Sequence, residues 1–453
     1  MAKPAKQKIL SSDVNRGRKR APFASVIVAL VLIVSCAIFV GIRNGWNRGN
    51  TDSGNPGQMQ TIDTQPPETT DDKPSGHEVA PPPTISEVTP PPKTSAVKVN
   101  GVYIGAWFGG DEERISGYID LCEKGKINTL VIDVKDDIGQ ITFSNSNEIL
   151  SQTSYNIIPD IGKTVSRLKE NGIYTIARLV CFKDPIWSKL NPGHAITDKY
   201  GNLWDDGKTP WLDPYDIATW EYIAATAVEA ALVGFDEIQL DYVRFPTDGR
   251  IDLIDYGSLA SEKTKAEVIG EFLEYVRTAL AGTSALLSAD AFGIISVSKG
   301  DFEDIGQDLD IMLQSVDYVC PMIYPSHFAN KRQNGVGQII NGVLFEIPDL
   351  EPYEVVLNIL KMYKSRLPED ESGALIRPYI QAFTADYLGA GYYQMYSEQE
   401  VVQQLQAVYD AGFDEWILWN NSGDPNLYRN VNSLISSENS AGSSSGTPAV
   451  NNA

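Results

Sequence analysis

Eight short apolar segments recur between residues 98 and 434 and alternate with longer amphipathic segments. Most of the apolar segments are hydrophobic on both faces, which is typical of strands that helices cover. Several of the longer segments end in Gly, a common residue just after the last turn of a helix. The apolar segments read GVYIGAW, TLVIDVKDD, YTIARLVCF, EIQLDYVRF, ALLSADAFG, DYVCPMIYP, RPYIQAFTA and EWILWNN. Helices are expected over Glu112–Lys124, Ile161–Asn171, Asp216–Val233, Ser261–Ala281, Leu350–Leu367 and Ser397–Ala411.

Eight strands that alternate with helices predict an α/β fold of the (β/α)₈, or TIM barrel, type. The region is longer than the ~250 residues typical of that fold. We therefore expect long loops after some strands, notably over Phe182–Asp216 and Pro325–Leu350. A doubly wound open sheet is the alternative, but no Gly-rich phosphate-binding loop follows the first strand.

The segment before the barrel indicates a membrane anchor. Residues 1–20 are basic, and Ala21–Ile42 contains no charge, which matches the ~20 apolar residues that cross a bilayer. Positive charge before the span predicts a cytoplasmic N-terminus and an extracellular C-terminal domain of a single-pass membrane protein. A cleaved signal peptide is the alternative, although its apolar region is usually shorter, roughly 7–15 residues, and ends in a cleavage site that this sequence lacks.

Two low-complexity segments flank the predicted domain. Residues 43–97 are rich in Pro, Thr and Asp, and residues 435–453 are rich in Ser, Gly and Asn. Neither segment has enough apolar residues to form a core, so we expect a disordered linker and a disordered tail. The folded domain is therefore predicted to span residues 98–434.

Composition excludes several classes of function. The net charge is −22, which argues against nucleic acid as a partner. Cys122, Cys181 and Cys320 have the spacing of neither a disulfide framework nor a zinc site. With three His in the whole chain, no metal site and no cofactor are predicted. Neither a GxSxG nucleophile motif nor a phosphate-binding P-loop is present, and the sequence does not indicate an oligomeric state.

Two acidic residues stand out because barrel active sites lie at the C-terminal ends of the strands. Asp241 lies within IQLDYVRF and Asp290 within LLSADAFG, so each carboxylate should be partly buried at the end of a strand. An unpaired buried carboxylate is unfavourable, and Arg178 or Arg244 is the expected partner of Asp241. Two carboxylates on neighbouring strand ends are the arrangement that glycoside hydrolysis needs. A purely structural ion pair is the alternative for Asp241.

Further polar and aromatic residues near the strand ends are candidates for binding substrate or tuning the two acids. A neighbouring cation lowers the pKa of a carboxyl group and burial raises it, and aromatic faces stack on sugar rings. Single acids after strands often cap helices instead, a role that fits Asp136, Asp137 and Asp184, although we keep Asp136 and Asp137 as alternative catalytic acids. The substrate-binding candidates are Lys135, Asp136, Arg178, Trp211, Tyr242, Arg244, Tyr324 and Trp419.

Together the segments resemble a bacterial family of glycoside hydrolases with a barrel domain. The resemblance rests on GVYIGAWFGG, TLVIDVKDDIGQITF, IARLVCFKDP, WLDPYD, FDEIQLDYVRFP, LSADAFG, VCPMIYPSHF and WILWNN, in this order. It covers roughly residues 98–430 and implies a TIM barrel that hydrolyses glycosidic bonds.

The fourth strand also resembles that of chitinases, which reads Asp-Gly-x-Asp-x-Asp-x-Glu. Asp236 and Asp241 match the first and last Asp of that motif, but Glu237, Gln239 and Val243 replace the Gly, the middle Asp and the catalytic Glu. The chitinase mechanism is therefore not implied.

The α-amylase superfamily, in contrast, has its nucleophilic Asp at the end of strand 4, where Asp241 lies. The acid of that superfamily is a Glu at the end of strand 5, and the nearest match here is Asp290.

These observations predict a membrane-anchored extracellular glycoside hydrolase that cleaves a polysaccharide or cell-envelope glycan. Asp241 would act as nucleophile or base and Asp290 as general acid. Two alternatives remain open. The barrel would either bind a glycan without cleaving it, or be a structural domain whose acids form caps and ion pairs.

Overall fold

The computed structural model describes residues 97–297, 304–369, 373–422 and 425–442. The predicted cytoplasmic segment, the anchor over residues 21–42, the linker before residue 97 and the end of the tail lie outside these residues. Among the described helices, none is both long enough and apolar enough to cross a membrane.

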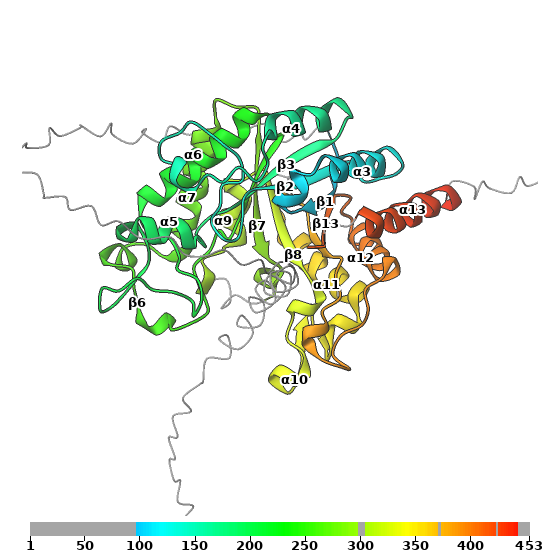
Figure 1. Ribbon diagram of the computed structural model, residues 1–453. Helices are drawn as coiled ribbons and strands as arrows, with labels where there is room; N and C mark the ends of the chain where they lie inside the picture. Colours follow the sequence, from blue (N-terminus) through cyan, green and yellow to red (C-terminus); the bar gives the residue numbers. More distant parts are fainter. Residues whose placement is uncertain (1–96, 298–303, 370–372, 423–424, 443–453) are drawn as a thin grey trace, which may run out of the picture.

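The core of the domain is a closed barrel of eight parallel strands, which confirms the predicted fold (Figure 1). Each strand pairs in parallel with the next in the order given below, and the last strand pairs with the first, so the sheet has no free edge. A further short strand, β11 (Leu375–Ile376), pairs in parallel with the first two residues of β8. The barrel strands are β1 (Asn100–Ile104), β2 (Thr129–Lys135), β3 (Tyr174–Val180), β5 (Glu237–Asp241), β7 (Leu286–Phe292), β8 (Tyr318–Ile323), β12 (Tyr379–Gln381) and β13 (Trp416–Trp419).

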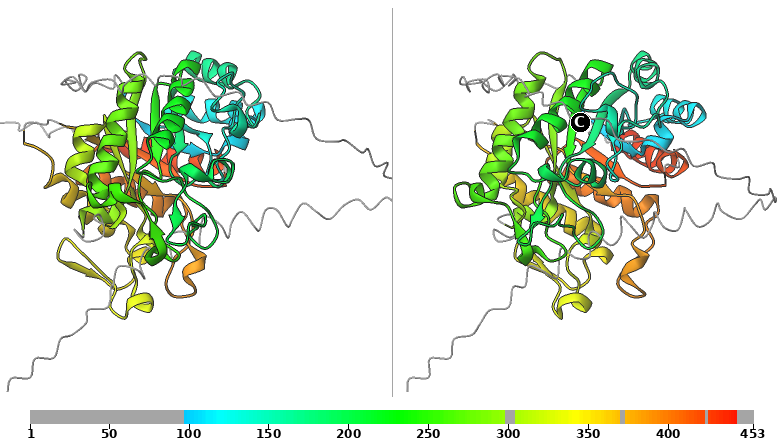
Figure 2. Two further views of the ribbon diagram at one scale, coloured as in Figure 1. Left: turned by 90° about the vertical axis from the view of Figure 1, so that its left-hand side faces the viewer. Right: turned by 60° about the vertical axis from the view of Figure 1, so that its left-hand side comes forward.

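Helices follow the strands and surround the barrel, as the views in Figure 2 show. All six predicted helices are present within a few residues of their expected bounds. Their starts follow the expected chemistry, since Asp111 and Asp216 cap α3 and α6, and Thr264 and Ser397 form capping boxes. The surrounding helices are α3 (Glu112–Glu123), α4 (Ile161–Glu170), α6 (Ile217–Val233), α7 (Lys265–Leu280), α9 (Leu309–Ser315), α11 (Pro352–Lys364), α12 (Glu398–Asp410) and α13 (Pro425–Gly442).

The two long loops predicted after strands β3 and β8 carry short elements of their own. They lie with the other strand-to-helix loops at the carboxyl end of the barrel. At the other boundary, α13 continues past Leu434, where we placed the end of the domain. The loop after β3 contains α5 (Pro185–Leu190) and β4 (Thr197–Asp198), and the loop after β8 contains α10 (Lys331–Asn334), β9 (Gln338–Ile340) and β10 (Val343–Phe345). Two further short elements, α2 (Ala106–Gly109) and β6 (Ile254–Asp255), lie in the loops after β1 and β5.

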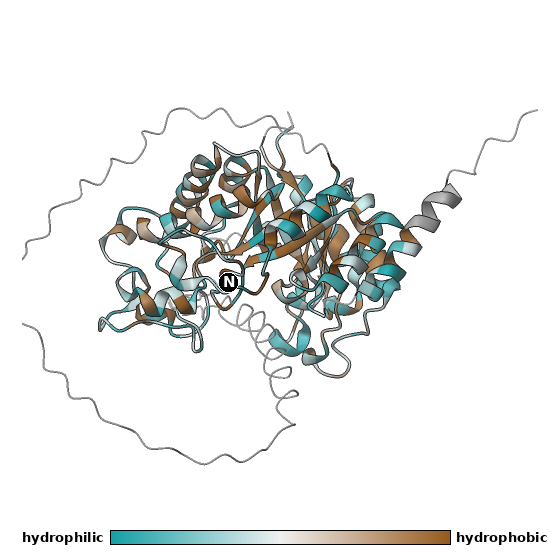
Figure 3. Cartoon of the chain, turned by 45° about the horizontal axis from the view of Figure 1, so that its top comes forward, coloured by the Kyte–Doolittle hydropathy of each residue, from teal (hydrophilic) through white to brown (hydrophobic). Residues whose placement is uncertain are grey.

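Hydrophobic residues concentrate in the strands and polar residues on the outer helices, as Figure 3 shows. The larger apolar cluster lies between the strands and the helices, and a smaller one that includes Tyr103, Ile176 and Tyr379 lines the inside of the barrel. Towards the start of the strands the interior is closed by a buried ion-pair network. There Arg377 donates to Glu237 at 2.7 and 2.9 Å and to Glu415 at 2.8 Å. Because this network fills the interior near the start of the strands, we look for a functional site at the carboxyl end of the barrel.

Candidate active site

Asp241 and Asp290 lie at the same height on neighbouring strands. Leu240 pairs with Ala289 between β5 and β7, and the two acids are the next residues on their strands. Asp241 is 6% exposed and Asp290 is 1% exposed. Gln307 fixes the two strand ends, because its Nε2 donates to the backbone oxygens of Val243 (3.2 Å) and Asp290 (3.1 Å). No local sequence pattern indicates this role of Gln307.

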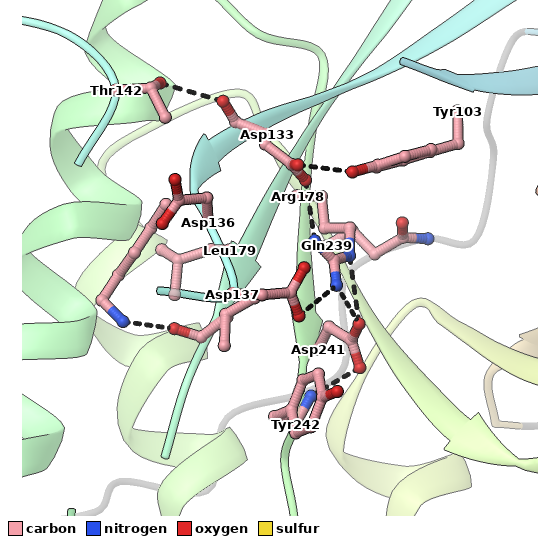
Figure 4. A network of polar contacts seen from close by, with 12 residues as sticks. Tyr103, Asp133, Asp136, Asp137, Thr142, Arg178, Leu179, Gln239, Asp241 and Tyr242 are labelled. Carbon is pink, nitrogen blue, oxygen red and sulfur yellow. Dashed lines mark hydrogen bonds and ion pairs between the residues drawn. The ribbon is translucent and has the colours of Figure 1, made fainter. Parts of the chain in front are cut away.

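Arg178 is the centre of the polar group inside the barrel (Figure 4). Its Nε and Nη2 both donate to Oδ2 of Asp241, at 3.0 and 2.5 Å. Its Nη1 donates to Oδ1 of Asp133 at 2.8 Å, and its Nη2 also lies 3.4 Å from Oδ1 of Asp137. Of the two partners predicted for Asp241, the structure therefore confirms Arg178. Arg178 contacts three carboxylates, which come from β2 (Asp133), the loop after β2 (Asp137) and β5 (Asp241).

The acids around Arg178 differ in their electrostatics. Burial raises the pKa of Asp133 to about 6, in spite of the nearby Arg178. Burial would also raise the pKa of Asp137, but Arg178 and Lys183 together hold it below its ordinary value. Asp137 is thus a carboxylate at neutral pH, and its side chain is 33% exposed.

Asp290 has a different environment from Asp241. Its Oδ1 has no hydrogen-bond partner among the described residues. Burial, followed by the charge of Asp241, raises the pKa of Asp290 well above its ordinary value. The two neighbouring acids therefore combine an ion-paired carboxylate with a buried acid that retains its proton at higher pH, which is how paired acids divide the two roles of acid and base.

An aromatic pair closes one side of the Arg178 group. Tyr103 and Trp419 stack with ring centroids 3.9 Å apart, and the guanidinium of Arg178 lies 5.6 and 5.3 Å from these rings. The Tyr103 hydroxyl donates to Oδ2 of Asp133 at 2.6 Å. Trp419 was a predicted candidate, whereas Tyr103 and Asp133 were not selected. The inward position of Tyr103 follows from the closure of β1 against β13, which no local pattern encodes.

Lys135 does not belong to this group. The pairing of β2 with β3 shifts between Asp133 and Lys135, so the Lys135 side chain turns out of the barrel interior. Its Nζ lies 2.9 Å from Oδ2 of Asp184 and 2.7 Å from the Val180 oxygen, and both side chains are 0% exposed. This position does not support a contact with substrate.

Asp136 and Asp184 have mainly structural partners. Oδ1 of Asp136 accepts from the amides of Ile138 (3.1 Å) and Gln140 (2.8 Å), so it caps a turn and lies apart from Arg178 in Figure 4. Burial raises the pKa of Asp136 to about 7. Asp184 caps α5, as expected for an acid after a strand. Asp137 caps no helix, because it pairs with Arg178.

The remaining candidates lie beside Asp241 and Asp290. Tyr242 follows Asp241, and the guanidinium of Arg244 lies among the rings of Trp211 (4.9 Å), Tyr242 (5.3 Å) and Phe292 (4.9 Å). Trp211 and Arg244 are buried, so they support the wall of the site and do not present a free face to a sugar.

Tyr324 is also buried. Its ring contacts His327 edge to face at 5.0 Å. Burial, followed by the charges of Asp290 and Asp241, raises the pKa of Tyr324 well above its ordinary value, so the hydroxyl stays protonated. The charges of Asp290 and Asp241 therefore affect the pKa of Tyr324. In the part of the chain that the structure describes, no group of three or more His, Cys, Asp or Glu side chains is arranged to hold a metal ion.

Solved structures similar to this chain include glycoside hydrolases. The glycoside hydrolase domain of PgaB (BpsB) from Bordetella bronchiseptica is 14% identical, with a TM-score of 0.55 over 75% of this chain and 99% of that chain. A hypothetical protein from Ruminiclostridium thermocellum is 35% identical over 41% of this chain and 96% of that chain, with a TM-score of 0.38. Alpha-L-fucosidase isoenzyme 2 from Paenibacillus thiaminolyticus is 12% identical over 76% of this chain and 50% of that chain, with a TM-score of 0.49.

The PgaB likeness supports the fold alone, and no curated protein matches the chain. Residues 101–424, which include the barrel strands except the first residue of β1, match a family profile over more than half of the sequence. The chain therefore belongs to the DUF4015 family, described as "Putative glycosyl hydrolase domain".

Proposed function

We propose that the barrel hydrolyses O-glycosidic bonds of a polysaccharide or cell-envelope glycan. The observation that carries this proposal is the pair of acids at the ends of β5 and β7. Asp241 is an ion-paired carboxylate suited to act as nucleophile or base, and Asp290 is a buried acid with a raised pKa, suited to protonate the leaving oxygen. The matched family and the barrel fold support the same reaction class.

Arg178 supports the proposal by holding the Asp241 carboxylate in place. Two N–H donors of the Arg178 guanidinium form hydrogen bonds to the same oxygen of Asp241, and Arg178 is 2% exposed. A buried charge-assisted contact of this kind restricts the carboxylate to one orientation. Such fixed geometry is what positions an attacking group at the anomeric carbon.

The test is release of reducing ends by the purified full chain, kept in detergent, from a panel of polysaccharides of defined sugar and linkage. Release from at least one member, absent with heat-denatured protein, is the expected result. Binding to a member without release from any would favour a glycan-binding barrel. Neither binding nor release would contradict both functions and favour a structural role for the acids.

The proposal includes the location outside the cell. It is supported by the uncharged segment Ala21–Ile42 and the basic residues before it. Protease added to intact cells that make the chain should remove the barrel. A barrel that survives until the cells are lysed would contradict the outside location.

A further inference from the structure

Tyr242, directly after Asp241, has an unusual backbone. Its φ is 52°, and the only other non-Gly residue with positive φ among the described residues is Asn341. Asn tolerates the left-handed region, whereas a bulky aromatic residue there is a strained outlier. Strain of this kind persists only where the surrounding structure enforces it, and it concentrates at functional sites.

The left-handed backbone directs an amide at the neighbouring carboxylate. The Tyr242 N–H donates to Oδ1 of Asp241 at 2.6 Å. Arg178 supplies two donors to Oδ2 of the same carboxylate. A carboxylate has about four lone-pair positions. Both positions on Oδ2 and one on Oδ1 are thus taken by the contacts described, which leaves one position on Oδ1.

The Tyr242 side chain is held in place from several sides. The Lys183 ammonium lies 4.7 Å from the ring centroid and 3.3 Å from the hydroxyl. The guanidinium of Arg244 lies 5.3 Å from the ring, and Trp211 meets it edge-on at 5.9 Å. Trp211 and Arg244 are buried, so they form a rigid support. These contacts explain how the strained backbone is maintained.

We propose that Tyr242 is a positioning residue, whose left-handed backbone orients Asp241 so that Oδ1 is the oxygen that reacts with substrate or water. This inference rests on the proposed hydrolase function. The aromatic ring supports the backbone conformation, and the N–H acts on the carboxylate. The hydroxyl of Tyr242 has no direct role in the orientation of Asp241.

Variants at position 242 separate the backbone from the ring. Tyr242→Gly and Tyr242→Ala both remove the ring, but only Gly adopts positive φ without strain. We expect kcat of Tyr242→Ala to be about tenfold lower than that of Tyr242→Gly. The acidic limb of its pH–rate profile should move to higher pH, because the carboxylate loses a donor that favours its charged form.

A second measurement does not depend on activity. In the full chain labelled with [¹⁵N]tyrosine, the Tyr242 amide is identified by its loss in Tyr242→Phe. Its shift should change as the neighbouring carboxylate titrates, and this change should vanish in Asp241→Asn. An amide that does not respond to pH, or equal kcat and pH profiles for the Gly and Ala variants, would overturn the proposal. A responsive amide in a chain that hydrolyses nothing would retain the orientation of Asp241 and reject the hydrolase function.

Discussion

Asp241→Asn should lower kcat on the order of 10⁴-fold and leave the barrel folded. An amide is neither a nucleophile nor a base, so the reaction loses the group that attacks or activates water. The fold should survive because Arg178 keeps Asp133 at 2.8 Å and Asp137 at 3.4 Å. We expect a stability loss of about 1–3 kcal/mol, the usual effect of removing one partner of a buried polar contact.

The measurement is kcat on the best polysaccharide of the panel, with thermal unfolding followed by circular dichroism. Asp414→Asn is the matched control, because Asp414 precedes β13 at the opposite end of the barrel and its side chain is 56% exposed. The control should keep full activity. Wild-type kcat in Asp241→Asn would reject Asp241, and loss of activity in Asp137→Asn alone would identify Asp137 as the reacting carboxylate.

Asp290→Asn should lower kcat about 10²–10⁴-fold, the usual contribution of a general acid, and stabilise the protein at neutral pH. Burial raises the pKa of Asp290 well above its ordinary value of 3.8, so between these two values the folded state binds more protons than the unfolded state. The contribution of Asp290 to the free energy of unfolding is therefore fully present below about pH 4 and is lost as the pH rises above that value. Asparagine does not ionise and avoids this loss.

Thermal or denaturant unfolding between pH 3 and pH 8 tests the stability effect. The gain of Asp290→Asn over the wild type should be close to zero at about pH 3. It should increase by up to about 1.4 kcal/mol per unit above about pH 4. An aryl glycoside with a good leaving group should show a smaller loss of kcat than the polysaccharide, because it needs little protonation. Equal losses on both substrates, or a destabilised variant at pH 7, would contradict the role of general acid.

Much of the fold was predictable because the forces that form its elements are local. The strand and helix positions followed from runs and periods of apolar residues, and the ends of several helices followed from Gly. In the structure, Asp111, Asp216, Thr264 and Ser397 accept hydrogen bonds from amides in the first turns of their helices. The long loops after β3 and β8 followed from the length that remained between strands. Sequence similarity was less reliable for single positions. Asp236, which matches the chitinase motif, directly precedes β5, at the opposite end of this strand from Asp241. Its side chain accepts a hydrogen bond from the Thr175 amide and forms an ion pair with Lys169.

The candidate site was predictable only in part. Asp241, Arg178 and Trp419 were found because strand ends converge in a barrel, and the structure brings them together. Lys135 was expected beside them because it lies near the end of a strand, but an irregularity in the pairing of β2 with β3 turns it towards Asp184.

The sequence alone therefore determined the strands, the helices and the end of the barrel where polar residues gather, because burial and capping act over a few neighbouring residues. Only the tertiary structure decided which acids contact Arg178, why burial raises the pKa of Asp290, and how Tyr242 contacts Asp241. These properties depend on closure of the sheet and on the electrostatic environment of a buried interior, to which residues far apart in the chain contribute.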